Sequence, residues 1–244
     1  MKSIVLLHGW GMSPHVFDDL RAHLSIRYDV QAFALPAYDN GSSCEPCTLD
    51  GMVAALSARA PARCCVAGWS LGGQIALAWA RSAPEQVERL VLLGTSPCFV
   101  QRAGWNTAIE ARVLQDFAAA LDRDCEATLK RFLTLQVQGD IAAIDVLRTL
   151  RGCLRDEAVP SAQTLRAGLK VLLDTDLREA LPLIAQDTLV IHGENDALAP
   201  VAAGEYLARM LPSGRLVVIR GAAHAPFLSA PDEVTKAVME FVDD

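Results

Sequence analysis

Short apolar runs separated by helical stretches are the feature of this sequence that most restricts its fold. Such runs occupy residues 4–7, 28–35 (with one polar break), 64–67, 90–93, 188–191 and 216–219. Strands that are apolar on both faces belong to a sheet covered on both sides, which is typical of parallel sheets in α/β proteins. Between the early runs, apolar residues recur every three or four positions, as in Phe17, Leu20 and Leu24, which predicts amphipathic helices.

The alternation of strands and helices is interrupted once. After residue 97 the strand signal stops, and the pattern from 105 to 173 is helical. Strands return at 188–191, and residues 233–242 close the chain as an amphipathic helix. We therefore expect an α/β core with a mostly parallel central sheet and helices on both faces, made of residues 1–97 and 174–244. A helical cap is expected to be inserted at residues 98–173.

Length and charge narrow the possibilities further. With 244 residues, of which 52% are apolar, the chain can build one large core but not two complete enzymatic domains. A net charge of −7 argues against nucleic acid as a partner. No apolar stretch approaches the roughly 20 residues of a membrane span, and none has the form of a secretion signal. We expect a cytoplasmic protein that has no membrane contact and acts as a monomer.

The cysteines fit a reducing compartment. There are seven, an odd number scattered along the chain, at positions 44, 47, 64, 65, 98, 125 and 153. Cys44 and Cys47 have the spacing of a redox or zinc motif, but no second pair or histidine cluster accompanies them. We therefore expect two free thiols in a loop, and neither a metal nor a cofactor.

A G-x-S-x-G motif supplies a candidate nucleophile. Residues 68–73 read Gly-Trp-Ser-Leu-Gly-Gly and lie between the apolar run 64–67 and a helical pattern at 74–80. The motif works in this strand–turn–helix setting, because small residues two before and two after the serine let strand and helix approach. We predict Ser70 as the nucleophile, with the Leu71 N–H directed at the site from the positive end of a helix.

One of the five histidines is placed to act as the base that a serine nucleophile needs. His224 follows the last predicted strand in a loop of small residues, at the carboxyl end of the sheet where α/β proteins gather their ligands. We predict His224 as the general base. His192, at the end of the strand before, is expected to pack there.

Two acidic residues compete for the role of orienting the histidine. Glu194 and Asp196 both follow the predicted strand 188–191. We favour Asp196, because the loop and proline after it carry its carboxylate over the sheet edge, and we keep Glu194 as the alternative. The resulting order Ser, Asp, His along the chain is that of α/β hydrolases, so these residues predict the α/β-hydrolase fold.

The first predicted strand ends in the segment His-Gly-Trp-Gly at 8–11. Its glycines free the backbone, so the Trp10 N–H is a candidate for the second oxyanion donor beside that of Leu71. The Trp10 ring is also placed to wall an acyl pocket. We expect His8 to be a buried, hydrogen-bonded histidine beneath this loop.

Together these residues resemble one family, the pimeloyl-[acyl-carrier protein] methyl ester esterases of biotin synthesis. The resemblance covers nearly the whole chain. It is carried by the motifs at 8–11 and 68–73, by Ser-Pro-Cys-Phe at 96–99, by Arg-Phe-Leu-Thr-Leu-Gln at 131–136 and by Ala-Ala-His-Ala-Pro-Phe at 222–227. The last three distinguish this family from other α/β hydrolases. The chain departs from the superfamily pattern by beginning directly at the run 4–7, without leading strands, which leaves the edge of the sheet undecided.

The resemblance implies a carboxylesterase that converts the methyl ester of pimeloyl-[acyl-carrier protein] to pimeloyl-[acyl-carrier protein] and methanol. It places the catalytic roles on Ser70, Asp196 and His224. It places substrate contacts on Trp10, Ser70, Leu71, Phe132, Gln136 and His224. Independently, aromatic and aliphatic side chains would give the cap an apolar underside for an acyl chain, namely Phe99, Trp105, Phe132, Leu133 and Leu135.

A basic stripe in the predicted cap is a candidate docking surface. Arg148, Arg151 and Arg155 are spaced three and four residues apart, which places them on one side of a helix. Acyl carrier proteins are strongly acidic, so a local basic patch would steer them to the site although the net charge of the chain opposes it. A solvated helix face is the alternative for a short stripe alone. The resemblance implies that cap arginines, with Arg131 among them, meet the carrier.

Two other readings stay open on sequence alone. A short-chain esterase of broad specificity, or a C–C bond hydrolase, would use the same triad on small substrates. A non-catalytic ligand receptor on the same fold can retain the triad as well. Turnover of p-nitrophenyl acetate separates the receptor from the enzymes, and growth of a biotin auxotroph separates the carrier-linked esterase from the others.

Overall fold

A six-stranded parallel sheet forms the centre of the computed structural model, which describes residues 1–36, 38, 47–155 and 160–244. The strands are β1 (Ser3–Leu7), β2 (Asp29–Phe33), β3 (Cys64–Trp69), β4 (Val87–Leu93), β5 (Asp187–Gly193) and β6 (Gly214–Ile219). Their order is β2-β1-β3-β4-β5-β6, and each neighbouring pair is parallel. The prediction of an α/β protein with a parallel sheet is confirmed, and β2 occupies the edge that the sequence left undecided.

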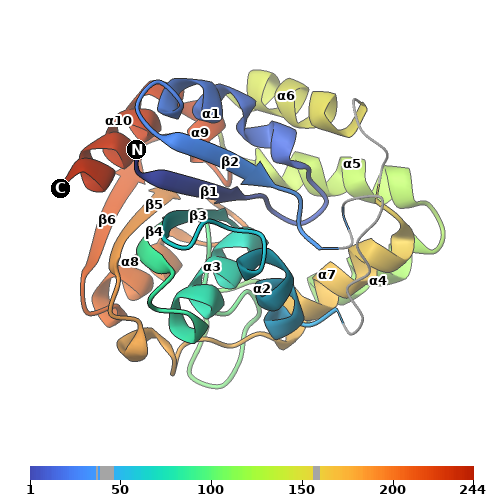
Figure 1. Cartoon of the computed structure of the whole chain (residues 1–244). Helices are drawn as coiled ribbons and strands as arrows, with labels where there is room; N and C mark the ends of the chain where they lie inside the picture. The colour runs from blue at the N-terminus through green and yellow to red at the C-terminus, as the bar shows by residue number, and fades with distance from the viewer. Residues whose placement is uncertain (37, 39–46, 156–159) are drawn as a thin grey trace.

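Helices cover both faces of the sheet (Figure 1). One face carries α1 (Asp18–Leu24), α9 (Pro226–Ser229) and α10 (Pro231–Asp243), and the other carries α2 (Leu49–Ser57), α3 (Leu71–Ser82) and α8 (Val201–Met210). Successive residues of β1 alternate between two buried clusters, with Val5 and Leu7 in one and Ile4 and Leu6 in the other. Because both of its faces are buried, β1 reads as an unbroken apolar run from Ile4 to Leu7.

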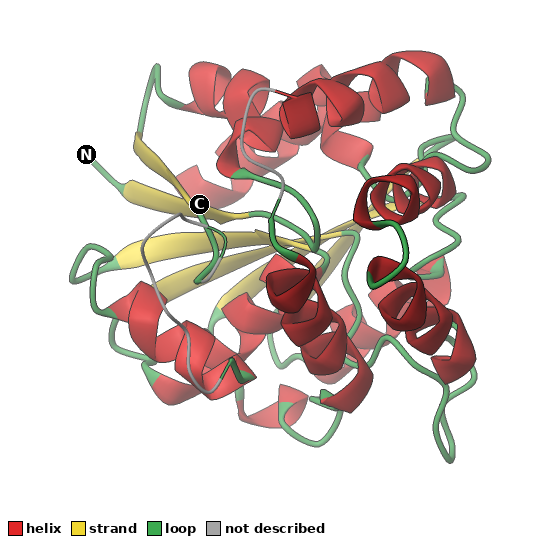
Figure 2. Cartoon of the chain, turned by 90° about the vertical axis from the view of Figure 1, so that its right-hand side faces the viewer, coloured by secondary structure: helices red, strands yellow, loops and turns green. Residues whose placement is uncertain are grey.

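A further set of helices lies between β4 and β5 in the chain and covers the carboxyl ends of the strands (Figures 1 and 2). They are α4 (Ala111–Leu121), α5 (Cys125–Gln136), α6 (Ala143–Arg155) and α7 (Ala162–Asp174). The helical pattern was expected from residue 105, but the first of these helices begins at Ala111. Residues 100–109 form a loop instead, in which the Trp105 Nε1–H donates to the Cys98 carbonyl at 2.8 Å.

The inserted helices share the two hydrophobic clusters of the core. On α5, Phe132 belongs to the cluster of α2 and α3, whereas Leu133 belongs to the cluster that contains Phe17 and Phe227. Leu150 of α6 joins the second cluster as well. Consecutive helical residues point about 100° apart, so α5 can bury side chains in both clusters at once. Packing therefore makes the inserted helices continuous with the core.

Two further features considered in the sequence are a membrane span and a cysteine pair. Within the described residues, no helix is long and apolar enough to cross a bilayer. Cys44 lies outside the described residues, so the pairing of Cys44 with Cys47 has no structural description. Elsewhere in the described chain, no group of three or more His, Cys, Asp or Glu side chains is arranged to hold a metal ion.

The shared core predicts that the inserted helices unfold together with the sheet. Leu150→Ala should lower the free energy of unfolding by about 2–5 kcal/mol, because it opens a cavity at a fully buried position. Urea unfolding followed by tryptophan fluorescence and by circular dichroism should remain one coincident transition. Ile144→Ala on the same helix, where the side chain is 76% exposed, is the control and should cost less than about 0.5 kcal/mol. A separate early transition in Leu150→Ala would contradict the shared core.

Candidate active site

Ser70 lies at the turn between β3 and α3 with a strained backbone. Its φ is 56° and its ψ is −117°, and among the described non-glycine residues it alone has a positive φ. A Cβ on Gly68 would lie 2.2 Å from the Gly72 carbonyl oxygen, and one on Gly72 would lie 2.2 Å from the Leu7 carbonyl oxygen. The two glycines of the motif are therefore required by close backbone approach, and the packing around the turn holds the strain.

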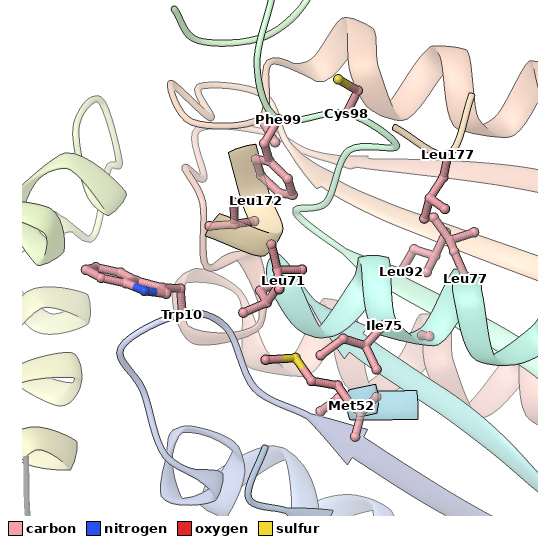
Figure 3. Packing of buried hydrophobic residues seen from close by; sticks show 14 of the residues in the cluster. Trp10, Met52, Leu71, Ile75, Leu77, Leu92, Cys98, Phe99, Leu172 and Leu177 are labelled. Carbon is pink, nitrogen blue, oxygen red and sulfur yellow. The ribbon is translucent and has the colours of Figure 1, made fainter. Parts of the chain in front are cut away.

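Leu71 begins α3, so its N–H is among the unpaired donors at the positive end of that helix. The Leu71 side chain is fully buried. Figure 3 shows it at the start of α3, on the side where Phe99 and Leu172 of α7 lie. The backbone donor and an apolar wall thus come from the same residue.

His224 follows β6 and is 1% exposed. Its Nδ1 lies 2.8 Å from Asp196 Oδ2, which leaves Nε2 as the nitrogen that can exchange a proton with a serine hydroxyl. Trp69 Nε1–H donates to the His224 carbonyl at 2.7 Å. Because Trp69 directly precedes Ser70, this bond ties the histidine loop to the nucleophile turn.

Asp196 and Glu194, the two candidate acids, accept hydrogen bonds from different groups. Asp196 Oδ1 accepts the N–H groups of Leu198 and Ala199 at 2.9 Å each, which fixes the side chain and leaves Oδ2 for His224. Glu194 Oε2 accepts the N–H of Gly221 at 2.9 Å and so closes the same histidine loop from outside. The geometry therefore brings Asp196, the favoured acid, to the His224 ring.

The loop after β1 is held by a buried histidine. His8 Nδ1–H donates to the Gly9 carbonyl at 2.8 Å, and its Nε2 accepts the Leu35 N–H at 3.0 Å. The bond that Nε2 accepts requires the neutral ring, and burial lowers the pKa of His8 to about 4. The expectation of a buried, hydrogen-bonded His8 is confirmed. Sequence reasoning missed Tyr38, whose hydroxyl accepts the Gly11 N–H at 3.3 Å and whose position carries no local motif.

Trp10 connects this loop to the inserted helices (Figure 3). Its Nε1–H donates to the Leu165 carbonyl of α7 at 2.7 Å, and its ring packs edge-to-face on Phe132 of α5 at 4.7 Å between centroids. A Cβ on Gly168 would lie 2.7 Å from Trp10 Cδ1, so only glycine fits beneath the ring. A Cβ on Gly9, the preceding residue, would lie 3.3 Å from Ser70 Cβ, so the loop passes beside the nucleophile.

The other predicted pocket residues divide between two places. Phe132 lies with Trp10 as expected, and Phe99, Trp105 and Leu135 pack in or against the same cluster. Leu133 packs on the opposite side of α5 in the second cluster, which corrects its assignment to the apolar underside. Gln136 is 1% exposed, and its Oε1 is buried without a hydrogen-bond partner in the described structure.

His192 packs at the end of β5, as expected. It is fully buried, its Nε2–H donates to the Ala199 carbonyl at 2.6 Å, and burial lowers its pKa. The same nitrogen lies 3.7 Å from Asp196 Oδ2. A neutral His192 is therefore hydrogen-bonded to the loop after β5 that carries Asp196.

The predicted docking arginines are only partly brought together. Arg148 and Arg151 line a shallow cavity of about 420 Å³ on α6, with Ile144, Leu147 and Gly152. Arg148 also forms an ion pair with Asp145 at 2.5 Å. Arg131, on α5, stacks its guanidinium over the Phe117 ring at 4.4 Å. The Arg155 side chain lies outside the described structure.

Comparison with known proteins identifies the family. Residues 4–237 match the alpha/beta hydrolase family. The pimeloyl-[acyl-carrier protein] methyl ester esterase of Nitrosomonas europaea is 42% identical over 230 residues, which cover 94% of this chain and 91% of that protein. The enzyme of the same name from Aromatoleum aromaticum is 41% identical over 244 residues, covering 98% and 97%. This chain belongs to their family of α/β hydrolases.

Solved structures agree with the fold. An esterase from Exiguobacterium antarcticum superposes with a TM-score of 0.89 at 22% identity, covering 100% of this chain and 92% of that one. An enol-lactonase from Burkholderia xenovorans LB400 superposes with a TM-score of 0.87 at 22% identity, with the same coverage. At this identity the likeness extends to the α/β-hydrolase fold, which confirms the predicted fold class.

His8 predicts a pH dependence of stability. The folded state holds His8 neutral with a pKa of about 4, whereas the unfolded chain has the ordinary value of 6.5. The contribution of His8 is therefore complete above pH 6.5 and is lost as the pH falls from 6.5 toward 4. It should amount to about 2 kcal/mol between pH 7 and pH 5.

Urea unfolding at pH 7 and pH 5 measures this effect. His8→Gln should unfold more easily at pH 7 but lose less stability on acidification than the unsubstituted protein. His23→Gln, at an exposed position on α1, is the matched control for the loss of a histidine. The same loss of stability on acidification in His8→Gln and in the unsubstituted protein would contradict the assignment.

Proposed function

We propose that this chain is a serine carboxylesterase that hydrolyses the methyl ester of pimeloyl-[acyl-carrier protein], with Ser70 as nucleophile, His224 as base and Asp196 as the orienting acid. The observation that carries the proposal is the buried 2.8 Å bond between His224 Nδ1 and Asp196 Oδ2, in a loop tied to the strained Ser70 turn. The relatives at 41–42% identity, named for this reaction, support the choice of substrate.

In the acylation step, Ser70 Oγ attacks the ester carbonyl carbon while His224 Nε2 takes the hydroxyl proton. The charge that develops on the carbonyl oxygen is stabilised by the N–H groups of Trp10 and Leu71. His224 then gives its proton to the leaving methoxy oxygen, so that methanol departs and the pimeloyl group stays esterified to Ser70. Throughout, Asp196 holds the imidazole in the tautomer that keeps Nε2 available.

In the deacylation step, His224 takes a proton from water, and the resulting nucleophile attacks the acyl-serine carbonyl. Collapse returns the proton to Ser70 Oγ and releases a free carboxylate at the end of the pimeloyl chain. The link to the carrier protein, at the other end of that chain, takes no part in the reaction. The enzyme thereby turns an apolar ester end into a charged one.

The acyl chain is proposed to lie between the core and the inserted helices. Trp10, Leu71 and Phe132 supply buried apolar walls, and the Gln136 amide supplies a buried polar group with an unused acceptor. We propose that residues 98–173 act as the cap of this site. Small esters are expected to enter the same site without the carrier.

The cap is also proposed to dock the acidic carrier through Arg131, Arg148, Arg151 and Arg155. The cavity lined by Arg148 and Arg151 supports this surface, because basic side chains border the exposed side chain of Ile144 there. Charge would steer the carrier, and apolar contact would hold it.

Removing the nucleophile tests the proposed function directly. Ser70→Ala should lower methanol release from the carrier-linked methyl ester by about 10⁴–10⁶-fold without loss of fold, because the triad acts as a unit. Asp196→Asn should cost somewhat less, and Glu194→Gln, the matched control in the same loop, far less. If Glu194→Gln were the more damaging acid variant, the orienting carboxylate would be misassigned. If the unsubstituted protein released no methanol from any methyl ester, the function would be wrong.

Replacing the arginines of the basic stripe tests the proposed docking of the carrier protein. The triple variant Arg148→Ala, Arg151→Ala, Arg155→Ala should lower kcat/KM on the carrier-linked ester by roughly 3- to 100-fold, since exposed ion pairs contribute little singly. Its kcat/KM on p-nitrophenyl butyrate should be unchanged. A matched control replaces three exposed arginines near the amino ends of strands, Arg27, Arg63 and Arg215. Equal losses in both triple variants would mean that net charge alone attracts the carrier.

A further inference from the structure

The turn between α5 and α6 is bonded to the loop that carries His224. The His224 N–H donates to the Gln136 carbonyl at 3.1 Å, at the end of α5. The Ile141 N–H donates to the Gly221 carbonyl at 2.9 Å, just before α6. Both ends of the turn are therefore joined to the histidine loop by backbone bonds.

Asp140 adds a side-chain contact between these two bonds. Its Oδ2 accepts the Ala223 N–H at 2.7 Å and the Ser229 hydroxyl at 2.6 Å, and its Oδ1 accepts the Ala142 N–H at 2.8 Å. The residue is 8% exposed. A carboxylate that accepts several hydrogen bonds out of water is a strong, directional anchor. Ala223 directly precedes His224, so this anchor acts on the peptide that sets the direction of the imidazole.

The loop that carries Asp196 is hydrogen-bonded to the same turn. Asn195 Nδ2–H donates to the Gly139 carbonyl at 2.8 Å, and Asn195 directly precedes Asp196. The backbone at Gly139 has a φ of 84°, which turns its carbonyl within reach. One short turn thus contacts the residue before each of two triad members.

We propose that Asp140 is a positioning residue for His224, which holds the Ala223 peptide so that the imidazole keeps its direction between Asp196 and Ser70. The proposal rests on the proposed function, because it assigns a role within the same reaction. Asp140 does not touch the reacting atoms. It acts through the histidine, so its loss should impair the chemical step more than substrate binding.

An isosteric amide cannot replace this carboxylate. Both Asp140 oxygens accept hydrogen bonds, Oδ1 from Ala142 and Oδ2 from Ala223 and Ser229. In Asp140→Asn, one of the two positions becomes an NH₂ group that faces a backbone N–H. Either orientation of the amide keeps the size of the side chain and leaves one donor–donor contact, with the Ala142 N–H or with the Ala223 N–H. The side chain therefore loses the position from which it holds the turn and the histidine loop together.

Steady-state kinetics on p-nitrophenyl butyrate test the proposal. Asp140→Asn should lower kcat about 10- to 100-fold while KM changes less than about two-fold, because small displacements of a catalytic group have effects of that size. The rate at which a fluorophosphonate labels Ser70 should fall by a similar factor, since that reaction also needs the base. If Asp140→Asn does not fold, Asp140→Glu, with both oxygens one methylene further out, takes its place with the same expectation.

Two controls separate positioning from stability. Ser229→Ala removes one donor to the same oxygen and keeps the Ala223 bond, so it should lower Tm with little change in kcat. Asp116→Asn, at an exposed site on α4, should change neither. A kcat for Asp140→Asn equal to that of Ser229→Ala would overturn the proposal, and so would a loss confined to KM. Absence of ester turnover in the unsubstituted protein would instead overturn the proposed function.

Discussion

Contact between backbone atoms at the nucleophile turn is the constraint on which the rest of the site depends. Gly68 lies against the Gly72 backbone and Gly72 lies against the Leu7 backbone, so closely that neither position has room for a Cβ. That approach places the start of α3 against the end of β1 and forces Ser70 into a conformation that few side chains adopt. This approach also brings the start of α3 and the loop after β1 beside the Ser70 side chain. Backbone N–H groups from both segments therefore lie near the serine.

The parallel sheet brings three segments that are distant in the sequence, the loops after β3, β5 and β6, to the same edge. Neighbouring parallel strands end at the same edge, so the loops after β5 and β6 lie side by side and allow Asp196 to meet His224. The loop after β3 lies three strands away from β6, and the Trp69 indole spans the gap with its bond to the His224 carbonyl. The inserted helices lie over this edge of the sheet, with Trp10 bonded to one of them.

Sequence reasoning is most informative where the signal is local. The apolar strands and the turn at Ser70 could be read from consecutive residues, and the proposed acid and base, each at a strand end, are hydrogen-bonded in the structure. It could not find Tyr38 or Asp140, because each acts on a residue far along the chain and neither lies in a recognisable pattern. It also misplaced Leu133, since a helix buried on two sides hides which face points where.

The bond between Trp10 and α7 bears on how this scaffold can acquire new substrates. The Trp10 ring rests on the Gly168 backbone and donates to the Leu165 carbonyl, so the path of α7 is part of the geometry around Trp10, the proposed oxyanion donor. Changes to outward-facing side chains of α7 leave these two contacts in place. Changes that displace its backbone would alter reactivity together with selectivity. Variation in substrate range is therefore expected to come more readily from side chains that leave the α7 backbone in place than from changes at Leu165 or Gly168.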